Sequence, residues 1–454
     1  MAEHGFLNDE WTLEDDLGHA EHVRRLGEMV RTCQTPYVIG VHGDWGVGKT
    51  SFLRKLHLFI SGKDCDYNKA AEIRTGLWDD ASCNSNPIES VWFEAWRYQY
   101  EANPVAALLD EIRFHFTWTG KLTGKAAKLT YSALMSVGEL TKKIGISPRD
   151  IVSAGEKWEH DHLLGPVPSK LYRELLDDAV KKLLDGRKKK RLVIFVDDLD
   201  RCRADVAFSF LEAIKVYLSL TNCVFVLALD VRNVRRAVAK ELTNRGLIPD
   251  EEKIKPDLHA AAYLGKLFQS VYYLPALTDP AGYFGKLVKK YVAEQNDSRW
   301  EELVREHKLL PPNPRKIKFF VNGLSLFLTQ LEPVLGKANR TLDHHLVLIL
   351  TYLKLMANDL YRILESDQTY WALLVEFCRN PRREKLHSSL ENIPTLEVVT
   401  SPDGEVDFKY GPSYIDPANE GLFRAASLIR EWQGGRELSD LEWSIYFLRG
   451  GNAA

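Results

Sequence analysis

The stretch from residue 43 to residue 50 reads Gly43-Asp44-Trp45-Gly46-Val47-Gly48-Lys49-Thr50, a complete G-x-x-x-x-G-K-[ST] phosphate loop. The apolar run Tyr37 to Val41 precedes it, and apolar residues at helical spacing follow from Phe52 to Phe59, so the order predicts a strand, a glycine-rich loop and a helix. There, backbone N–H groups and the helix N-terminus surround a di- or triphosphate, Lys49 reaches the β and γ phosphates, and Thr50 ligates Mg²⁺. The residues expected to contact the nucleotide are Gly43, Asp44, Trp45, Gly46, Val47, Gly48, Lys49, Thr50 and Ser51.

A second motif, within Arg191 to Asp200, places carboxylates at the end of a buried strand. Its four consecutive apolar residues, Val193 to Val196, are typical of a strand that is buried on both faces. This is a Walker B pattern. Asp197 is expected to hold Mg²⁺ through water, and Asp198 is expected to polarise the water that attacks the γ phosphate. For Asp200, the alternative that it only caps the following helix stays open.

Strands and helices alternate around these motifs. A strand is expected at Ser90 to Ala95, and another fully buried strand, beginning at Asn222, ends at Asp230. The pattern predicts an α/β fold, a P-loop NTPase with a parallel sheet of the ASCE type, in which an extra strand is inserted between the two Walker strands. In that layout Asp230 lies near the γ phosphate and contributes to catalysis. The alternative is that Asp230 merely caps the helix that begins at Val231.

Composition predicts a multi-domain globular protein. The chain has 454 residues, of which 45% are hydrophobic and 27% charged, and its net charge of -3 gives no overall attraction to nucleic acid or acidic membranes. No signal sequence is recognisable, and no run approaches the 18 apolar residues of a membrane span, so a cytoplasmic protein with reduced thiols is expected. The cysteines, which show no C-x-x-C spacing, are Cys33, Cys65, Cys83, Cys202, Cys223 and Cys378.

Two regions are expected along the chain. Residues 1–335 form the nucleotide-binding domain, with a helical insertion at about 118–166 where glycine and proline interrupt the helical pattern. Residues 336–454 form a helix-rich C-terminal region that carries no chemical motif. We expect this second region to contact partners.

Several segments resemble the KAP P-loop NTPases, and the resemblance covers roughly residues 10–330. Besides the phosphate loop, the matching segments are Phe93 to Tyr98, Phe195 to Cys202, Leu211 to Lys215, Tyr263 to Gln269 and Asn313 to Asn322. The resemblance implies ATP hydrolysis used as a switch, often at membranes and, in bacteria, often in plasmid or phage conflict. Many members carry transmembrane helices between the Walker motifs, whereas the insertion here is rich in lysine and cannot span a bilayer. A soluble, bacterial-type member is therefore expected, and peripheral membrane contact stays open.

Two arginines are candidates for stabilising the charge that develops on the γ phosphate, in cis or in trans. Arg201 directly follows the Walker B acids, and its alternative is an ion pair with Asp200 or Asp205. Arg315, at the start of a helix, resembles the second-sensor position of related ATPases, and its alternative is a solvated helix residue. If either acts on a neighbouring subunit, the protein is a homo-oligomer.

Two further clusters are expected to have no chemical role. The basic run Arg187 to Arg191 is interpreted as a solvated turn rather than a grip on nucleic acid. His160 and His162 share a face only in a strand, and the segment lacks strand character, so we expect no metal there. Because the guanine-reading Asn-Lys-x-Asp motif is absent, ATP with Mg²⁺ is the expected ligand.

Three functions follow from these features. The expected one is an Mg-dependent ATPase that works as a conformational or assembly switch, signals to an effector protein, and acts in bacterial phage or plasmid defence. The second is a nucleic-acid-stimulated motor or clamp, and the third is a scaffold that binds nucleotide without turnover. The intact set Lys49, Thr50, Asp197 and Asp198 argues against the scaffold, and the mildly acidic balance argues weakly against the motor.

Overall fold

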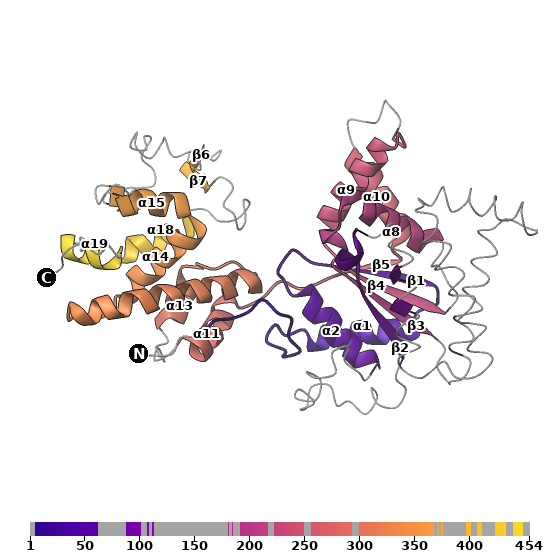
Figure 1. Ribbon diagram of the computed structural model, residues 1–454, viewed down its shortest axis with the longest axis horizontal. Helices are drawn as coiled ribbons and strands as arrows, with labels where there is room; N and C mark the ends of the chain where they lie inside the picture. The colour runs from indigo at the N-terminus through magenta and orange to yellow at the C-terminus, as the bar shows by residue number, and fades with distance from the viewer. Residues whose placement is uncertain are drawn as a thin grey trace, which may run out of the picture. The chain divides into compact units, whose positions relative to one another are not determined.

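Figure 1 shows the computed structural model of the chain. The described residues are 5–61, 88–100, 107–108, 111–112, 180, 184, 191–216, 222–248, 256–292, 299–366, 370–371, 374–375, 396–400, 406–410, 423–432 and 439–447. The chain divides into two compact units, one formed by Trp11–Pro275 and the other by Met1–Glu10 together with Ala276–Ala454. We describe each unit by itself.

The unit Trp11–Pro275 is built on a five-stranded parallel sheet, with strand order β2-β3-β4-β1-β5. The strands are β1 (Tyr37–His42), β2 (Glu89–Glu94), β3 (Leu192–Asp197), β4 (Cys223–Leu229) and β5 (Ser270–Tyr273). Because β4 pairs with both β1 and β3, it separates the strand before the phosphate loop from the Walker B strand. This confirms the predicted parallel, strand-inserted sheet.

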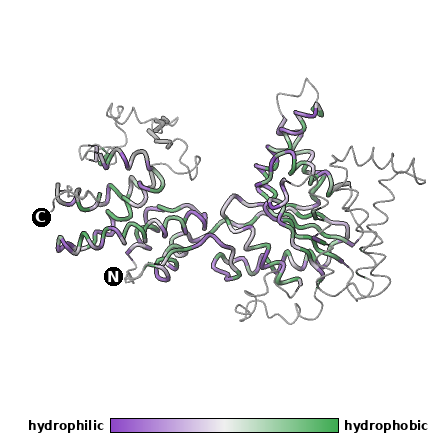
Figure 2. Tube along the Cα trace, in the orientation of Figure 1, coloured by the Kyte–Doolittle hydropathy of each residue, from purple (hydrophilic) through white to green (hydrophobic). Residues whose placement is uncertain are grey.

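Helices cover both faces of this sheet (Figure 1). On one face lie α1 (Ala20–Thr32) and α2 (Lys49–Ser61). On the other lie α8 (Ala204–Val216), α9 (Val231–Asn244) and α10 (Pro256–Leu267). Successive residues of β3 enter the two cores alternately, and the strand is buried throughout, as its uninterrupted apolar run predicts. Figure 2 shows the hydrophobic residues concentrated in these strands.

Short segments after the strands carry the polar residues of the sheet edge. A 3₁₀ turn, η1 (Ala95–Tyr98), follows β2, and a second one, η2 (Leu199–Arg201), follows β3. Helix α1 begins at Ala20, where the Asp15 carboxylate accepts hydrogen bonds from the backbone N–H groups of His19 (2.7 Å) and Ala20 (3.0 Å). These bonds satisfy donors that the first turn of a helix leaves unpaired.

The second unit is mainly helical. Its helices are α11 (Pro280–Tyr291), α12 (Arg299–Glu306), α13 (Pro314–Lys337), α14 (His344–Met356), α15 (Asn358–Ser366), α18 (Phe423–Trp432) and α19 (Asp440–Tyr446). An antiparallel pair of strands, β6 (Leu396–Thr400) and β7 (Val406–Tyr410), also belongs to this unit. The N-terminal segment belongs to this unit: the Asn322 side chain accepts from the backbone N–H of Leu7 and donates to its carbonyl, both at 2.7 Å.

The boundary between the compact units differs from the predicted domain boundary at residue 335. That position lies inside α13, a 24-residue helix that packs against both α11 and α14. A continuous helix with a shared core holds these elements in one unit. The predicted insertion at about 118–166 lies outside the described residues. No helix in the described part of the chain is both long and apolar enough to cross a membrane.

Candidate nucleotide-binding site

The phosphate loop connects β1 to α2 and depends on its glycines. Gly46 and Gly48 have φ values of 84° and 97°, a region that favours glycine. A Cβ atom on Gly43 would lie 2.7 Å from the Cγ2 atom of Val47, so a side chain there would force the loop open. The side chain of Trp45 is 62% exposed. The loop therefore has the backbone that the motif predicts, with Lys49 as the first residue of α2.

The ammonium group of Lys49 lies inside the loop. Its Nζ donates to the carbonyl oxygens of Gly43 (2.9 Å) and Asp44 (3.3 Å) and forms an ion pair with Oδ2 of Asp200 at 3.3 Å. The Lys49 side chain is only 9% exposed. The same Oδ2 of Asp200 accepts a hydrogen bond from the backbone N–H of Asp230 at 3.1 Å. Asp200 therefore joins the phosphate loop to the end of β4, a contact that its sequence position after the Walker B acids does not reveal.

Asp197 and Thr50 meet at the end of β3. The Asp197 side chain is 2% exposed, is hydrogen-bonded to the side chain of Thr50, and accepts from the backbone N–H of Asp198 at 2.9 Å. Burial, with a smaller contribution from the charge of Asp198, raises the pKa of Asp197 to about 7. Magnesium prefers hard oxygen ligands, and a cation would stabilise this buried carboxylate. The hydroxyl and carboxylate present here fit Mg²⁺, with Thr50 and Asp197 as the residues that would hold it.

Asp198 adopts a left-handed backbone conformation, with φ of 57°, at the turn between β3 and η2. Aspartate tolerates this region better than most residues, and such geometry occurs often at functional sites. Its carboxylate pairs with Nε of Arg201 at 2.9 Å. Burial raises the pKa of Asp198 above its ordinary value, and the Arg201 charge limits that rise. Of the two acids named as alternative partners for Arg201, Asp200 pairs with Lys49 and Asp205 pairs with Arg203.

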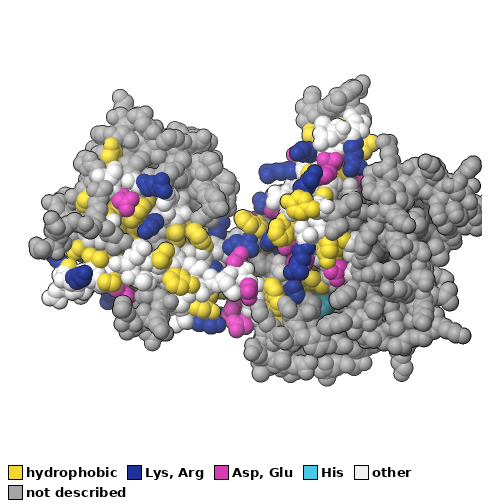
Figure 3. All heavy atoms as spheres, in the orientation of Figure 1, with side chains coloured by type: hydrophobic (Ala, Val, Ile, Leu, Met, Phe, Trp, Pro, Cys, Tyr) yellow, Lys and Arg dark blue, Asp and Glu magenta, His cyan; other side chains and the backbone are white. Residues whose placement is uncertain are grey.

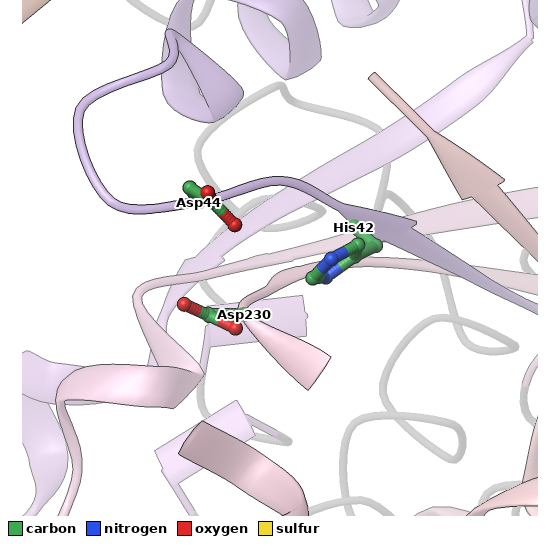
Figure 4. A group of neighbouring side chains, drawn as sticks. All are labelled: His42, Asp44 and Asp230. Atoms are coloured by element: carbon green, nitrogen blue, oxygen red, sulfur yellow. The ribbon is translucent and has the colours of Figure 1, made fainter. Parts of the chain in front are cut away.

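The end of β4 brings a second acidic group to the loop. Asp230 is buried and caps α9, accepting from the backbone N–H of Arg232 at 2.9 Å, so it does cap the helix, as the alternative held. It also lies close to Asp44 and His42 (Figure 4), with one ligand atom of each within 4.8 Å of the others. The Arg232 guanidinium contacts both carboxylates, and Nδ1 of His42 accepts from the backbone N–H of Val231 at 3.0 Å. Because these contacts already use Oδ1 of each aspartate and Nδ1 of His42, we assign no metal there.

Glu94, which the motif analysis did not single out, ends β2 directly beside the Walker B strand. It is in register with Asp197, and its Oε1 accepts from Arg54 and from the indole N–H of Trp92, both at 3.3 Å. The Arg54 guanidinium lies over the rings of Trp92 and Trp11, at 4.1 Å and 4.6 Å from their centroids. A carboxylate at the end of a strand beside β3 was the signal that could have identified it.

The remaining candidates belong to other elements of the structure or fall outside the described residues. Arg315 lies in the first turn of α13, in the second unit, where it pairs with Asp9 at 2.5 Å. Arg191 donates to the carbonyls of Val30 (2.7 Å) and Cys33 (3.1 Å) and so caps the C-terminus of α1. Residues 187–190 and both histidines of the 160–162 cluster are not among the described residues. In the described part of the chain, the cysteines outside any disulfide are Cys33, Cys202 and Cys223.

Three features define the class of protein as a P-loop NTPase of the strand-inserted class. They are a parallel sheet with a strand between the two Walker strands, a glycine loop around a lysine, and paired acids after β3. More particularly, the chain belongs to the KAP family: the family described as "KAP family P-loop domain" matches residues 20–331. This confirms the resemblance found in the sequence and supports nucleotide binding in general.

Other comparisons add little. Among solved structures, the chain is similar to the ORC2 protein of Aeropyrum pernix, whose structure was determined as ADPNP and ADP complexes. The identity is 12%, the match covers 91% of this chain and 94% of that one, and the TM-score is 0.33. A score this low carries no argument, so the fold assignment rests on the sheet topology and the family. A search of the curated proteins found no match.

Proposed function

We propose that the protein is an Mg-dependent ATPase whose hydrolysis cycle drives a conformational or assembly switch. The observation that carries the proposal is the convergence of Lys49, Thr50, Asp197 and Asp198 at one end of the sheet, with the Lys49 ammonium enclosed by the loop. On this proposal Lys49 contacts the β and γ phosphates, while Thr50 and Asp197 hold Mg²⁺. The cation would offset phosphate charge in the transition state.

Asp198 is the group proposed to orient the attacking water. Its carboxylate is held at one oxygen by Arg201, which favours the ionised form needed to accept a hydrogen bond from water. Arg201 is 40% exposed, so on this proposal it can also approach the phosphates of its own or a neighbouring subunit. We propose that Arg315 and Asp230 also contribute to catalysis.

A switch needs a route from the nucleotide to the rest of the protein. Asp200 contacts both Lys49 and the backbone of Asp230, the N-cap of α9. Phosphates that attract Lys49 compete with Asp200, so binding would change the contact that supports the start of α9. We extend the proposal to a cytoplasmic, soluble protein that acts through self-assembly or an effector in bacterial phage or plasmid defence; this extension is supported by the family resemblance alone. ATP, rather than another nucleotide, is the proposed substrate.

Steady-state hydrolysis with and without DNA, RNA and lipid vesicles tests the proposal. We expect basal, Mg-dependent turnover that nucleic acid does not stimulate; strong stimulation would favour the motor or clamp. Lys49→Ala should abolish tight ATP binding, whereas Asp198→Asn should keep binding and stop turnover, because one change removes a phosphate contact and the other removes water orientation. Tight binding without any turnover in the wild type would favour the scaffold and contradict the proposal.

Assembly is tested by mixing two inactive variants. If Arg201 completes the site of an adjacent protomer, mixing Arg201→Ala protein with Asp198→Asn protein should restore part of the activity through interfaces that carry one intact set. Specific activity should also rise with protein concentration. Rates that do not depend on concentration, with no rescue in the mixture, would remove the trans arrangement and leave the ATPase proposal in place.

A further inference from the structure

A salt bridge ties the phosphate loop to the first turn of α9. Nη2 of Arg232 lies 2.5 Å from Oδ1 of Asp44, and Nε of Arg232 lies 3.5 Å from Oδ1 of Asp230. Asp44 is the second residue of the phosphate loop, whereas Arg232 is the second residue of α9, 188 positions later. Figure 4 shows the Asp44 and Asp230 side chains facing the same space at the mouth of the loop. One guanidinium therefore holds two carboxylates together.

The position of Asp44 creates an electrostatic problem for a loop that binds polyphosphate. A carboxylate on the loop repels the negative charge of a nucleotide, and the buried carboxylate of Asp230 adds to that repulsion. Guanidinium stays protonated at every accessible pH and contacts carboxylates through several N–H groups. Arg232 therefore lowers the negative potential at the loop and fixes the loop backbone to α9 at the same time.

We propose that Arg232 is a positioning residue of the nucleotide site, which acts by neutralising Asp44 rather than by contacting the phosphates. The inference rests on the proposed nucleotide binding and assigns a role to a residue that no motif contains. Without Arg232, the Asp44 carboxylate faces the phosphates uncompensated and the loop loses its link to α9. The loss should grow with the number of phosphates on the ligand, because the repulsion scales with ligand charge.

The first test measures equilibrium binding, which does not depend on turnover. Arg232→Ala should weaken binding of a non-hydrolysable, Mg-bound ATP analogue about tenfold. This factor is at the low end for the loss of a charge-assisted contact, because the Arg232 and Asp44 side chains are 58% and 56% exposed. ADP should lose less than the triphosphate. The difference between variant and wild type should shrink as salt is raised, since exposed charges are screened.

The decisive test is rescue by a second substitution. Asp44→Asn removes the unpaired charge while keeping the shape of the side chain, so the double variant Arg232→Ala/Asp44→Asn should recover most of the wild-type affinity. Arg232→Lys, which keeps the charge, should lose less than Arg232→Ala. The matched control is Arg236→Ala: Arg236 is exposed one turn further along α9, where Lys and Arg side chains gather (Figure 3), and its replacement should leave affinity unchanged.

The outcomes separate the inference from the function on which it rests. If the wild type binds no nucleotide, the proposed function fails. If the wild type binds and Arg232→Ala binds equally well, or if Arg232→Ala is weakened and Asp44→Asn gives no recovery, the positioning role is wrong and the function stands. Thermal unfolding of each variant shows whether a loss of affinity reflects a loss of folded protein.

Discussion

The buried carboxyl of Asp197 gives the protein a stability that depends on pH in a predictable direction. Its pKa rises from the ordinary value of 3.8 to about 7, mainly through burial. The folded state then binds this proton more tightly than the unfolded chain does. Between about pH 4 and pH 7 the folded state therefore carries the extra proton, so stability is greatest below this window and is lost as the pH rises through it.

The size of the effect follows from the two pKa values. Each pKa unit corresponds to about 1.36 kcal/mol, so the difference between 3.8 and about 7 corresponds to roughly 4 kcal/mol once the pH exceeds 7. Asp197→Asn removes the titration and keeps an oxygen that accepts from Asp198, but its amide N–H groups need an acceptor. We take about 1–2 kcal/mol as the cost of burying those amide N–H groups without an acceptor. After this cost is subtracted, we expect the variant to be roughly 2–3 kcal/mol more stable than the wild type at pH 8.

Thermal unfolding between pH 5 and pH 8, in a chelator and without nucleotide, measures this. A gain of 2–3 kcal/mol corresponds to a rise of roughly 5–10 °C at pH 8 for a domain of this size, and the gain should vanish at pH 5. Asp205→Asn, whose exposed side chain pairs with Arg203, is the control and should follow the wild-type curve. Parallel curves for the wild type and Asp197→Asn across this range would refute the reasoning.

Three further predictions concern contacts elsewhere in the described structure. Lys55→Met should lower the free energy of unfolding by roughly 3 kcal/mol, because Lys55 is fully buried and pairs with Asp15 at 3.3 Å. Adding Asp15→Asn to the same chain should recover part of that loss, and thermal unfolding measures both effects. Gly27→Ala should lower the free energy of unfolding by about 1–3 kcal/mol, because its Cβ would lie 2.4 Å from the ring of Phe59. Gly265→Ala, whose Cβ would have no atom within 4 Å, is the control and should be neutral or stabilising. Equal effects of the two substitutions would contradict the packing argument. Asp200→Asn should tighten nucleotide binding several-fold in a calorimetric titration, since it removes the carboxylate that competes for Lys49; weaker binding would instead give Asp200 a direct role at the metal.

Local patterns predicted the fold where the signal lies within a short segment. The glycine loop, the apolar run of β3 and the run of β4 each specify an element on their own, and their order along the chain specifies the strand-inserted sheet. The compact units were less predictable. Leu7 and Asn322 are separated by 315 positions, and no periodicity or turn signal relates them.

The charged contacts of the site show the same limit. The sequence marks Lys49 and Asp230 as polar residues at the ends of elements, but not which carboxylate meets which cation. Asp200 faces Lys49 because β3 and β1 are both neighbours of β4, so that the segments after them converge. Arg232 meets Asp44 because β4 pairs directly with β1, so that the segments after these two strands also converge. Pairings of this kind depend on the strand order and on the exact positions of the segments that follow the strands. A single sequence predicts the class of sheet but not these individual contacts.

The charge balance of the loop determines what ligand it can accept. In the described contacts, three cations, Lys49, Arg201 and Arg232, pair with four carboxylates, those of Asp44, Asp198, Asp200 and Asp230. In the same set of contacts, the buried carboxyl of Asp197 pairs with none of these three cations. A polyphosphate would add more negative charge, so on the proposed function a metal-free nucleotide would meet net repulsion, and a divalent cation beside Asp197 would offset it. Each of the three cations already holds a protein carboxylate. On the proposed function, nucleotide binding is thus an exchange of partners, and its affinity is the difference between the new contacts and those given up.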